Sequence, residues 1–323
     1  MKAILQERFG PPETLRLSDT DPPEPGPDDV RVRIHAAAIN PADWHIARGD
    51  PYVARLMIGL SKPRIPVAGN DGAGVVEVVG ANVRGLRPGD EVLGFFRGAF
   101  AEYACAAEKK VVPKPASLSF EQAAAIPIAA TTALRGIRDV GGVTAGLRVL
   151  VNGAGGGVGH FAVQIAAALD AEVTGVCSTR NVELVRSIGA AHVIDYTTED
   201  FTAGPTRYDV ILDNVSNLPL SQLRRALSPK GTLVLNGGGT PGHVFGPIAT
   251  LLRAIVISPF LPQRLRPLPS KETREELLAV TELVEAGKLM PIVDRTYPLA
   301  ETAVGVGYVE QGHARGKVVV SVG

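Results

Sequence analysis

The sequence contains almost no cysteine: Cys105 and Cys177 are the only two in 323 residues, and they lie far apart with no C-x-x-C spacing. A disulfide framework and a zinc site built from cysteines both need several cysteines at close spacing, so both are excluded. We expect these two cysteines to be small residues of the core or of strands.

The chain also lacks an excess of charge of either sign, because 33 lysines and arginines balance 33 aspartates and glutamates. No broad basic surface is expected, which argues against a nucleic-acid partner. Long hydrophobic runs are missing too, since residues 248–260 contain Arg253 and Pro259 and are too short to span a membrane. The chain begins on a strand-like pattern with no secretory signal, so we expect a cytoplasmic protein.

The hydrophobic fraction of 45% is that of a globular protein, and hydrophobic periodicity divides the chain into three regions. Residues 1–119 combine short alternating strands with many turns, which predicts a β-rich domain. Residues 120–260 alternate apolar strands with helices, which predicts a parallel, doubly wound sheet covered on both faces. Residues 261–323 carry two helices and a final strand. The predicted fold class is α/β.

A glycine-rich segment, residues 151–159 (VNGAGGGVG), follows one predicted strand and opens a predicted helix at residues 158–169. It places Ala154, Gly156 and Gly159 at the three glycine positions of the dinucleotide fingerprint G-x-G-x-x-G. Gly156 would let the backbone approach a pyrophosphate, and Gly159 would let helix and strand pack closely. Free N–H groups at a helix start attract phosphate. We therefore predict a dinucleotide site formed by Ala154, Gly155, Gly156, Gly157, Val158 and Gly159.

The end of the second predicted strand indicates which dinucleotide is bound. An NAD site normally places an acid there to hold the ribose diol, but residues 175–181 (GVCSTRN) contain none. Ser178 and Arg180 could instead bind a 2′-phosphate, and Tyr196, just past the third strand, could add a hydroxyl. The pattern favours NADPH, with the alternative that Arg180 is only a solvated surface charge.

Further candidate contacts follow the later strands of the predicted sheet. In doubly wound sheets the ligand lies at the carboxyl edge of the strands. We therefore expect Asn217, Gly237, Gly238 and Phe260 at this edge, beside the cofactor.

Taken together, several segments resemble the medium-chain dehydrogenase/reductase superfamily in its zinc-free, quinone oxidoreductase-like branch. They are residues 35–43 (HAAAINPAD), 66–74 (PVAGNDGAG), 89–92 (GDEV), the glycine loop and residues 316–319 (GKVV). The resemblance covers essentially the whole chain. It implies a GroES-like catalytic domain at residues 1–119, an inserted Rossmann domain at residues 120–260 and a return to the catalytic domain at residues 261–323. It also implies a cofactor in the cleft between the domains, and a homodimer that pairs the edges of its Rossmann sheets.

Departures from the zinc alcohol dehydrogenases bear on the chemistry. Those enzymes have cysteine near the position of Asn40, Gly-His-Glu in place of Gly69-Asn70-Asp71, a further cysteine near residues 127–129 and a four-cysteine lobe that is missing here. A catalytic zinc needs three protein ligands, so we predict that no metal is bound. Without a Lewis acid, alcohol oxidation is disfavoured. Reduction of a conjugated enone needs only hydrogen bonds to the carbonyl that receives the charge.

The resemblance also suggests catalytic residues. Asn40 is similar to the family's polar residue near the nicotinamide and the substrate carbonyl, and Thr132 to the threonine that touches the nicotinamide ribose. His45 lies where related quinone reductases often carry a tyrosine, so it could donate to the carbonyl or supply the proton. The alternative is that His45 is a surface or satisfied histidine. Asp43 is expected to be a capping or turn residue.

The function expected from these features is NADPH-dependent, zinc-independent reduction of a quinone or of the activated C=C bond of an enone, a small-molecule substrate. One alternative is a metal-free ketone or aldehyde reductase. The other is a crystallin-like or scaffold protein that binds NADPH without turnover. The loops at residues 51–64 and 259–269 carry no substrate signature that can be read.

Overall fold

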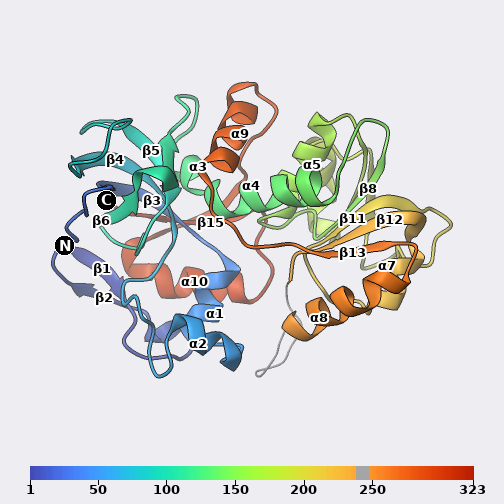
Figure 1. Cartoon of the computed structure of the whole chain (residues 1–323), viewed down its shortest axis with the longest axis horizontal. Coiled ribbons are helices and arrows are strands. Elements are labelled where there is room, and N and C mark those ends of the chain that lie inside the picture. Colours follow the sequence, from blue (N-terminus) through green and yellow to red (C-terminus); the bar gives the residue numbers. More distant parts are fainter. Residues whose placement is uncertain (238–246) are drawn as a thin grey trace. The chain divides into compact units, whose positions relative to one another are not determined.

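The computed structural model describes residues 1–237 and 247–323 (Figure 1). Contacts between residues divide the chain into two compact units, one formed by Met1–Thr131 with Glu272–Gly323 and the other by Thr132–Lys271. The boundaries between the units follow Thr131 and Lys271. Both lie later in the chain than the domain boundaries predicted from the sequence, which follow residues 119 and 260. Helix α3 (Phe120–Ala124) packs on strands of the first unit, and strand β13 (Arg264–Pro267) pairs within the second.

The first unit is built on a mixed sheet of seven strands in the order β14-β15-β3-β4-β5-β7, with β6 paired to β3. Strands β1 and β2 form a separate antiparallel pair. The strands are β1 (Lys2–Leu5), β2 (Arg16–Asp19), β3 (Asp29–Ile39), β4 (Asp71–Val79), β5 (Glu91–Phe95), β6 (Tyr103–Ala107), β7 (Val111–Pro113), β14 (Val293–Pro298) and β15 (Lys317–Ser321). The predicted β-rich domain is therefore confirmed.

Strand β3 connects the core of this unit to the candidate catalytic residues. Val30, Val32 and Ile34 are buried, and the intervening side chains are more exposed, as the period-two pattern predicts. From Ala36 to Ile39 four consecutive residues are buried. Strand β15 pairs with β3 along this stretch and β4 pairs with Ala36 to Ala38, while helices α3 and α10 (Thr302–Glu310) also contact β3. The chain then enters helix α1 (Pro41–Arg48) directly after Asn40. The remaining helices of this unit are α2 (Arg55–Ile58), α3, α9 (Arg274–Glu285) and α10 (Thr302–Glu310), and α4 (Pro127–Leu134) crosses the unit boundary.

The second unit is a sheet of six parallel strands in the order β10-β9-β8-β11-β12-β13. Numbered along the chain, this is the strand order 3-2-1-4-5-6 of a Rossmann domain, which reverses between β8 and β11. Besides β13, the strands are β8 (Arg148–Asn152), β9 (Glu172–Cys177), β10 (His192–Asp195), β11 (Tyr208–Asp213) and β12 (Leu227–Leu235). The predicted doubly wound sheet is confirmed.

Helix α5 covers one face of this sheet, and α7 and α8 cover the other (Figure 1). The helices are α5 (Gly159–Ala168), α6 (Val182–Ser187), α7 (Leu220–Arg225) and α8 (Pro247–Ile257). The shorter helical turns of the chain are Pro12–Thr14, Tyr52–Ala54, Glu108–Lys110, Arg135–Val140, Thr179–Asn181, Ser258–Phe260 and Leu299–Glu301. Within the described ranges, no helix has both the length and the apolar character needed to cross a bilayer.

Both cysteines lie where the sequence predicts. Cys105 is on β6 and Cys177 ends β9, and both side chains are buried and unpaired. Burial raises the pKa of each thiol to about 11, so neither forms a reactive thiolate near neutral pH.

Candidate active site

The glycine loop joins β8 to α5 at the point where the strand order reverses. The N–H groups of Gly153 and Ala154 donate to the carbonyl of Val176 at 3.1 and 2.9 Å, which ties the loop to β9. Among the described residues, the N–H groups of Gly155, Gly157 and Val158 have no hydrogen-bond partner. Three unpaired donors at a helix start form a cradle for an anion.

Glycine is needed at each of these loop positions for a different physical reason. A Cβ on Gly159 would lie 2.0 Å from the carbonyl oxygen of Gly153, so only glycine allows the loop and helix to approach. A Cβ on Gly155 would lie 2.7 Å from the side-chain nitrogen of Asn181. Of the atoms in the described residues, a Cβ on Gly156 would meet only the carbonyl oxygen of Gly153, at 3.4 Å. Gly156 therefore leaves open the space that a pyrophosphate needs.

A polar network lies at the carboxyl ends of β8 and β11. Its central residue, Asp213, was not among the site residues predicted from the sequence. Asp213 is 1% exposed, and its Oδ1 accepts from Asn152 Nδ2 at 2.8 Å and from the N–H groups of Val215 and Ser216 at 3.2 Å. Its Oδ2 is buried, and none of the described residues gives it a hydrogen-bond partner. An acid that directly follows the apolar run of residues 210–212 (VIL) was the signal that could have revealed it. A buried unpaired acceptor at the ligand edge of the sheet fits a dinucleotide that brings its own donors.

The predicted 2′-phosphate contacts lie at the ends of neighbouring strands. Ser178 is half-buried after β9, Arg180 is exposed in the next helical turn, and Tyr196 is 58% exposed after β10. The N–H of Tyr196 donates to the carbonyl of Cys177 at 3.0 Å, which brings the two strand ends together.

The same strand ends include an acid that the sequence search overlooked. Asp195 pairs in register with Cys177, so its carboxylate reaches the turn that follows β9. Its Oδ1 accepts from the N–H and Oγ1 of Thr197 at 3.0 and 2.8 Å, and hydrogen bonds from Thr179 and Thr197 hold its pKa below the usual range. An ionised acid therefore stands in the region where only Ser178, Arg180 and Tyr196 were expected.

The remaining cofactor candidates are spread more widely. Thr132 is half-buried on α4, while Asn217 and Gly237 are exposed after β11 and β12, and Gly238 lies outside the described residues. Phe260 is 85% exposed and comes shortly before β13, where Ser258 Oγ accepts from the N–H of Leu265. Because the strands are parallel, this segment lies toward their amino ends. The placement corrects the expectation that Phe260 shares the carboxyl edge.

In the first unit, Asn40 lies between an acid and a base. It is 3% exposed, its Nδ2 donates to Asp71 Oδ2 at 2.9 Å, and its Oδ1 accepts from Lys317 Nζ at 2.5 Å. Lys317 also donates to the carbonyl of Ile39 at 3.1 Å, and the N–H of Ile128 donates to Asp71 at 3.1 Å. The amide of Asn40 therefore has a fixed orientation, with both of its polar atoms occupied.

Burial controls the protonation of this cluster. It raises the pKa of Asp71 to about 7 and lowers the pKa of Lys317. It also raises the pKa of Asp43 to about 6, although the N–H of Asn40 donates to that carboxylate at 2.7 Å. Asp43 thus makes the contact expected of a capping residue. Asp71 is fully buried, and within the described ranges its Oδ1 has no partner. Because its pKa is about 7, this acid can gain or lose a proton near neutral pH.

His45 is placed to act as an acceptor. Its ring stacks on Trp44 with centroids 3.5 Å apart, and its Nδ1 lies 3.1 Å from the carbonyl oxygen of Asp50. A carbonyl only accepts, so Nδ1 carries the proton and Nε2 of the neutral ring has none to give. Burial lowers the pKa of His45, which favours this neutral form.

The residues that replace zinc ligands make other contacts. Asn70 Nδ2 donates to Glu272 Oε1 at 3.0 Å, and Asn40 is held as described above. In the part of the chain that the structure describes, no three histidine, cysteine, aspartate or glutamate residues gather as a metal site would require. Metal independence stays a prediction.

Comparisons with known proteins agree with this geometry. Residues 26–116 match the model of the alcohol dehydrogenase GroES-like domain, and residues 188–320 match that of the zinc-binding dehydrogenase family. A chloroplast envelope quinone oxidoreductase homolog of Arabidopsis thaliana is 33% identical, over 92% of this chain and 91% of that protein. The 2-methylene-furan-3-one reductase of Solanum lycopersicum is also 33% identical, over 99% of this chain and 79% of that protein.

Solved structures lead to the same family. The Escherichia coli quinone oxidoreductase complexed with NADPH has a TM-score of 0.84 and 25% identity, with all of both chains covered. The two family models match the chain in this order, with the GroES-like domain first and the zinc-binding dehydrogenase family second. The chain belongs to the quinone oxidoreductase-like branch of the medium-chain dehydrogenase/reductase superfamily.

Proposed function

We propose that this protein is an NADPH-dependent, zinc-independent reductase of quinones or of the activated C=C bond of enones. The observation that carries the proposal is the anion cradle, in which Gly155, Gly157 and Val158 offer unpaired N–H groups beside the open space at Gly156. The relatives named for quinone and for methylene-furanone reduction support these two substrate classes.

The chain's own residues would bind and orient the reactants. The glycine loop would hold the pyrophosphate, and the nicotinamide cofactor, when bound, supplies the hydride. We propose Asn40 as the polar residue near the substrate carbonyl, with its amide held in place by Asp71 and Lys317. The second N–H of its Nδ2, whose other contact is the carbonyl of Ala38 at 3.4 Å, would turn to the substrate carbonyl and orient it. Solvent supplies the proton that completes reduction, since neutral His45 has no proton to give at Nε2.

One assay separates this function from its alternatives. NADPH oxidation is followed with a small quinone, an enone and a ketone, with and without a chelator. Turnover of the quinone or enone that the chelator leaves unchanged supports the proposal. Turnover of the ketone alone would identify a metal-free ketone or aldehyde reductase. Quenching of protein fluorescence by NADPH without any turnover would identify a scaffold protein.

We propose a preference for NADPH over NADH, and Arg180 is the residue that tests it. Arg180→Ala should weaken NADPH binding by about 10- to 100-fold and NADH binding little, because one charge-assisted contact to a 2′-phosphate is lost. Binding of both cofactors is measured by titration at low and high salt, and the difference between them should narrow as salt rises.

The matched control is Arg186→Ala, because Arg186 is an exposed arginine of α6 that pairs with Glu183 at 2.9 Å. It should leave both affinities unchanged. If Arg180→Ala weakens the binding of NADPH and NADH by the same factor, Arg180 is only a surface charge. Asp195→Asn provides a second measurement, because removal of an ionised acid near the site should raise NADPH affinity relative to NADH.

His45→Phe should retain kcat/KM within about threefold at pH 8, because the neutral ring is not a proton donor there. The pKa of His45 lies below its ordinary value, so imidazolium is scarce at this pH. Steady-state rates from pH 5.5 to 9 for the unmodified enzyme and the variant are the measurement. A loss of more than tenfold at pH 8 would contradict this reading and restore His45 as a proton donor.

We also propose a homodimer, because β13 is an edge strand of the six-stranded sheet and could pair with a second copy. Light scattering should then give twice the chain mass of 33.8 kDa. A cytoplasmic location stays a proposal, which fractionation of the producing cells would test.

A further inference from the structure

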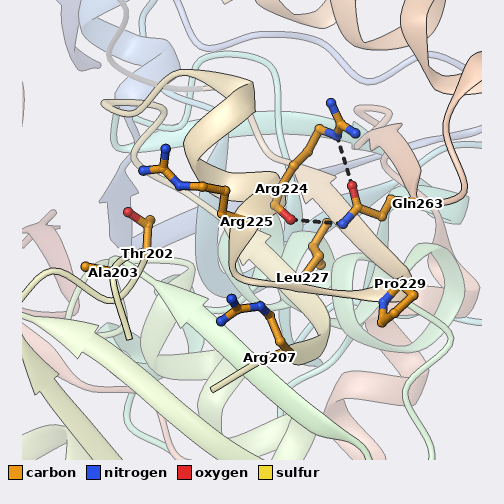
Figure 2. Close-up of a pocket in the computed structure, with 8 residues that line it drawn as sticks. All are labelled: Thr202, Ala203, Arg207, Arg224, Arg225, Leu227, Pro229 and Gln263. Atoms are coloured by element: carbon orange, nitrogen blue, oxygen red, sulfur yellow. Dashed lines mark hydrogen bonds between the residues drawn. The ribbon is translucent and has the colours of Figure 1, made fainter. Parts of the chain in front are cut away.

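A groove of about 600 Å³ in the second unit is lined by three arginines, Arg207, Arg224 and Arg225 (Figure 2). Ala203, Leu227 and Pro229 provide apolar surface beside them. The volume lies within the range of small-molecule sites. Nothing in the reductase function proposed above uses these residues.

The groove lies at the amino ends of the parallel strands, whereas the glycine loop lies at their carboxyl ends. Arg207 comes directly before β11, Leu227 opens β12 and Gln263 comes directly before β13. All three strands are parallel to β8, whose carboxyl end carries the glycine loop. A ligand in the groove and a dinucleotide at the glycine loop would therefore lie at opposite ends of the strands.

The three guanidinium groups are not neutralised by ion pairs. Across residues 1–237 and 247–323, no carboxylate oxygen lies within ion-pair distance of any of them. The charge of Arg225 acts on Asp200, whose Oδ1 accepts from the N–H and Oγ1 of Thr202 at 2.8 Å each. These two hydrogen bonds direct one carboxylate oxygen to Thr202. In a chain of zero formal charge, the groove is a local concentration of positive charge.

Hydrogen bonds hold two of the arginines in position. Arg224 Nε donates to Gln263 Oε1 and Gln263 Nε2 donates back to the carbonyl of Arg224, both at 2.9 Å, as Figure 2 shows. Arg207 donates through one terminal nitrogen to the carbonyls of Gly204 and Thr206 at 2.8 and 3.0 Å. Arg225 is exposed at the end of α7. Most of the N–H groups of these side chains thus remain available to a ligand.

We propose that this groove binds a free small molecule that carries a phosphate group and an apolar portion. Guanidinium groups bind phosphate oxygens through paired, charge-assisted hydrogen bonds. The phosphate would lie between Arg207 and Arg225, and the apolar portion would pack on Leu227 and Pro229.

The test titrates inorganic pyrophosphate into full-length protein already saturated with NADPH, so that the glycine loop is occupied. Calorimetry should find one binding site per chain. Arg207→Ala/Arg225→Ala should weaken this binding at least about 10-fold, because two charge-assisted contacts are lost. Arg207→Lys/Arg225→Lys keeps the charge but not the planar guanidinium group. Its affinity for pyrophosphate should lie between those of the unmodified protein and the alanine double variant. Both arginines are exposed, so the variants should fold.

Arg186→Ala is the matched control and should bind pyrophosphate normally, since it removes an arginine of the same unit outside the groove. Absence of binding to the NADPH-saturated protein, or equal binding by the alanine double variant, would overturn the proposal. Glycerol 3-phosphate should compete with pyrophosphate. Co-sedimentation with phosphatidic acid vesicles that the double variant abolishes would overturn the assignment to a free molecule and indicate a lipid headgroup instead.

Discussion

Gly156→Val should weaken NADPH binding by at least about 100-fold while the chain still folds, because contacts worth about 3 to 6 kcal/mol are lost. Gly156 lies beside the unpaired N–H groups of Gly155, Gly157 and Val158. A valine side chain would fill the space through which a pyrophosphate reaches them. The fold should survive, because the one described atom that a Cβ at this position meets is the carbonyl oxygen of Gly153, at 3.4 Å.

Binding is measured by calorimetry and folding by thermal melting. Gly204→Val is the matched control, because a Cβ there would have no atom within 4 Å and the residue lies in the same unit. It should keep full affinity for NADPH. If Gly156→Val binds NADPH as tightly as the unmodified protein, the pyrophosphate does not lie on this loop.

Lys317→Met should lower the free energy of unfolding by about 3 kcal/mol near pH 8 and by much less near pH 5. Lys317 is 2% exposed and donates to the amide of Asn40, which in turn donates to Asp71. Its charge lowers the pKa of Asp71, which burial otherwise raises. Without Lys317, that pKa rises further.

The pH dependence follows from the sign of this shift. A carboxyl whose pKa is raised in the folded state favours the protonated form, so its contribution to stability is present at low pH and is lost as pH rises through the folded-state value. For Asp71 that value is about 7, and it lies higher in the variant. Urea denaturation at both pH values is the measurement. Asp71→Asn/Lys317→Met should recover stability at pH 8, whereas an equal loss at pH 5 and pH 8 would show that Asp71 does not titrate.

The local pattern of the chain was enough to predict the dinucleotide loop. Its strand, glycines and helix are consecutive, and their roles depend on spacing that the sequence displays directly. The close approach at Gly159 and the open space at Gly156 agree with those predicted roles. The alternation of apolar strands and helices likewise predicted the parallel sheet, because burial on both faces leaves few polar positions.

The polar contacts around the two candidate sites depend instead on which strands are neighbours. Lys317 reaches Asn40 across 277 residues because β15 pairs with β3, and no periodicity in either segment indicates this. Asp195 reaches the turn after β9 because β10 lies beside β9 in that register. A search for an acid along one strand could not find an acid that a neighbouring strand supplies.

The direction of the strands decided at which end of the sheet Phe260 and the groove arginines lie. Phe260 precedes β13 rather than following a strand, so it lies toward the amino edge and away from the glycine loop. The same edge gathers Arg207, Arg224 and Arg225 from segments that the sequence presents as ordinary surface charges. The sequence by itself determined the elements, their order and the glycine loop, because these follow from local spacing and hydrophobic periodicity. Only the tertiary structure decided which side chains meet, because those contacts depend on strand pairing between distant segments.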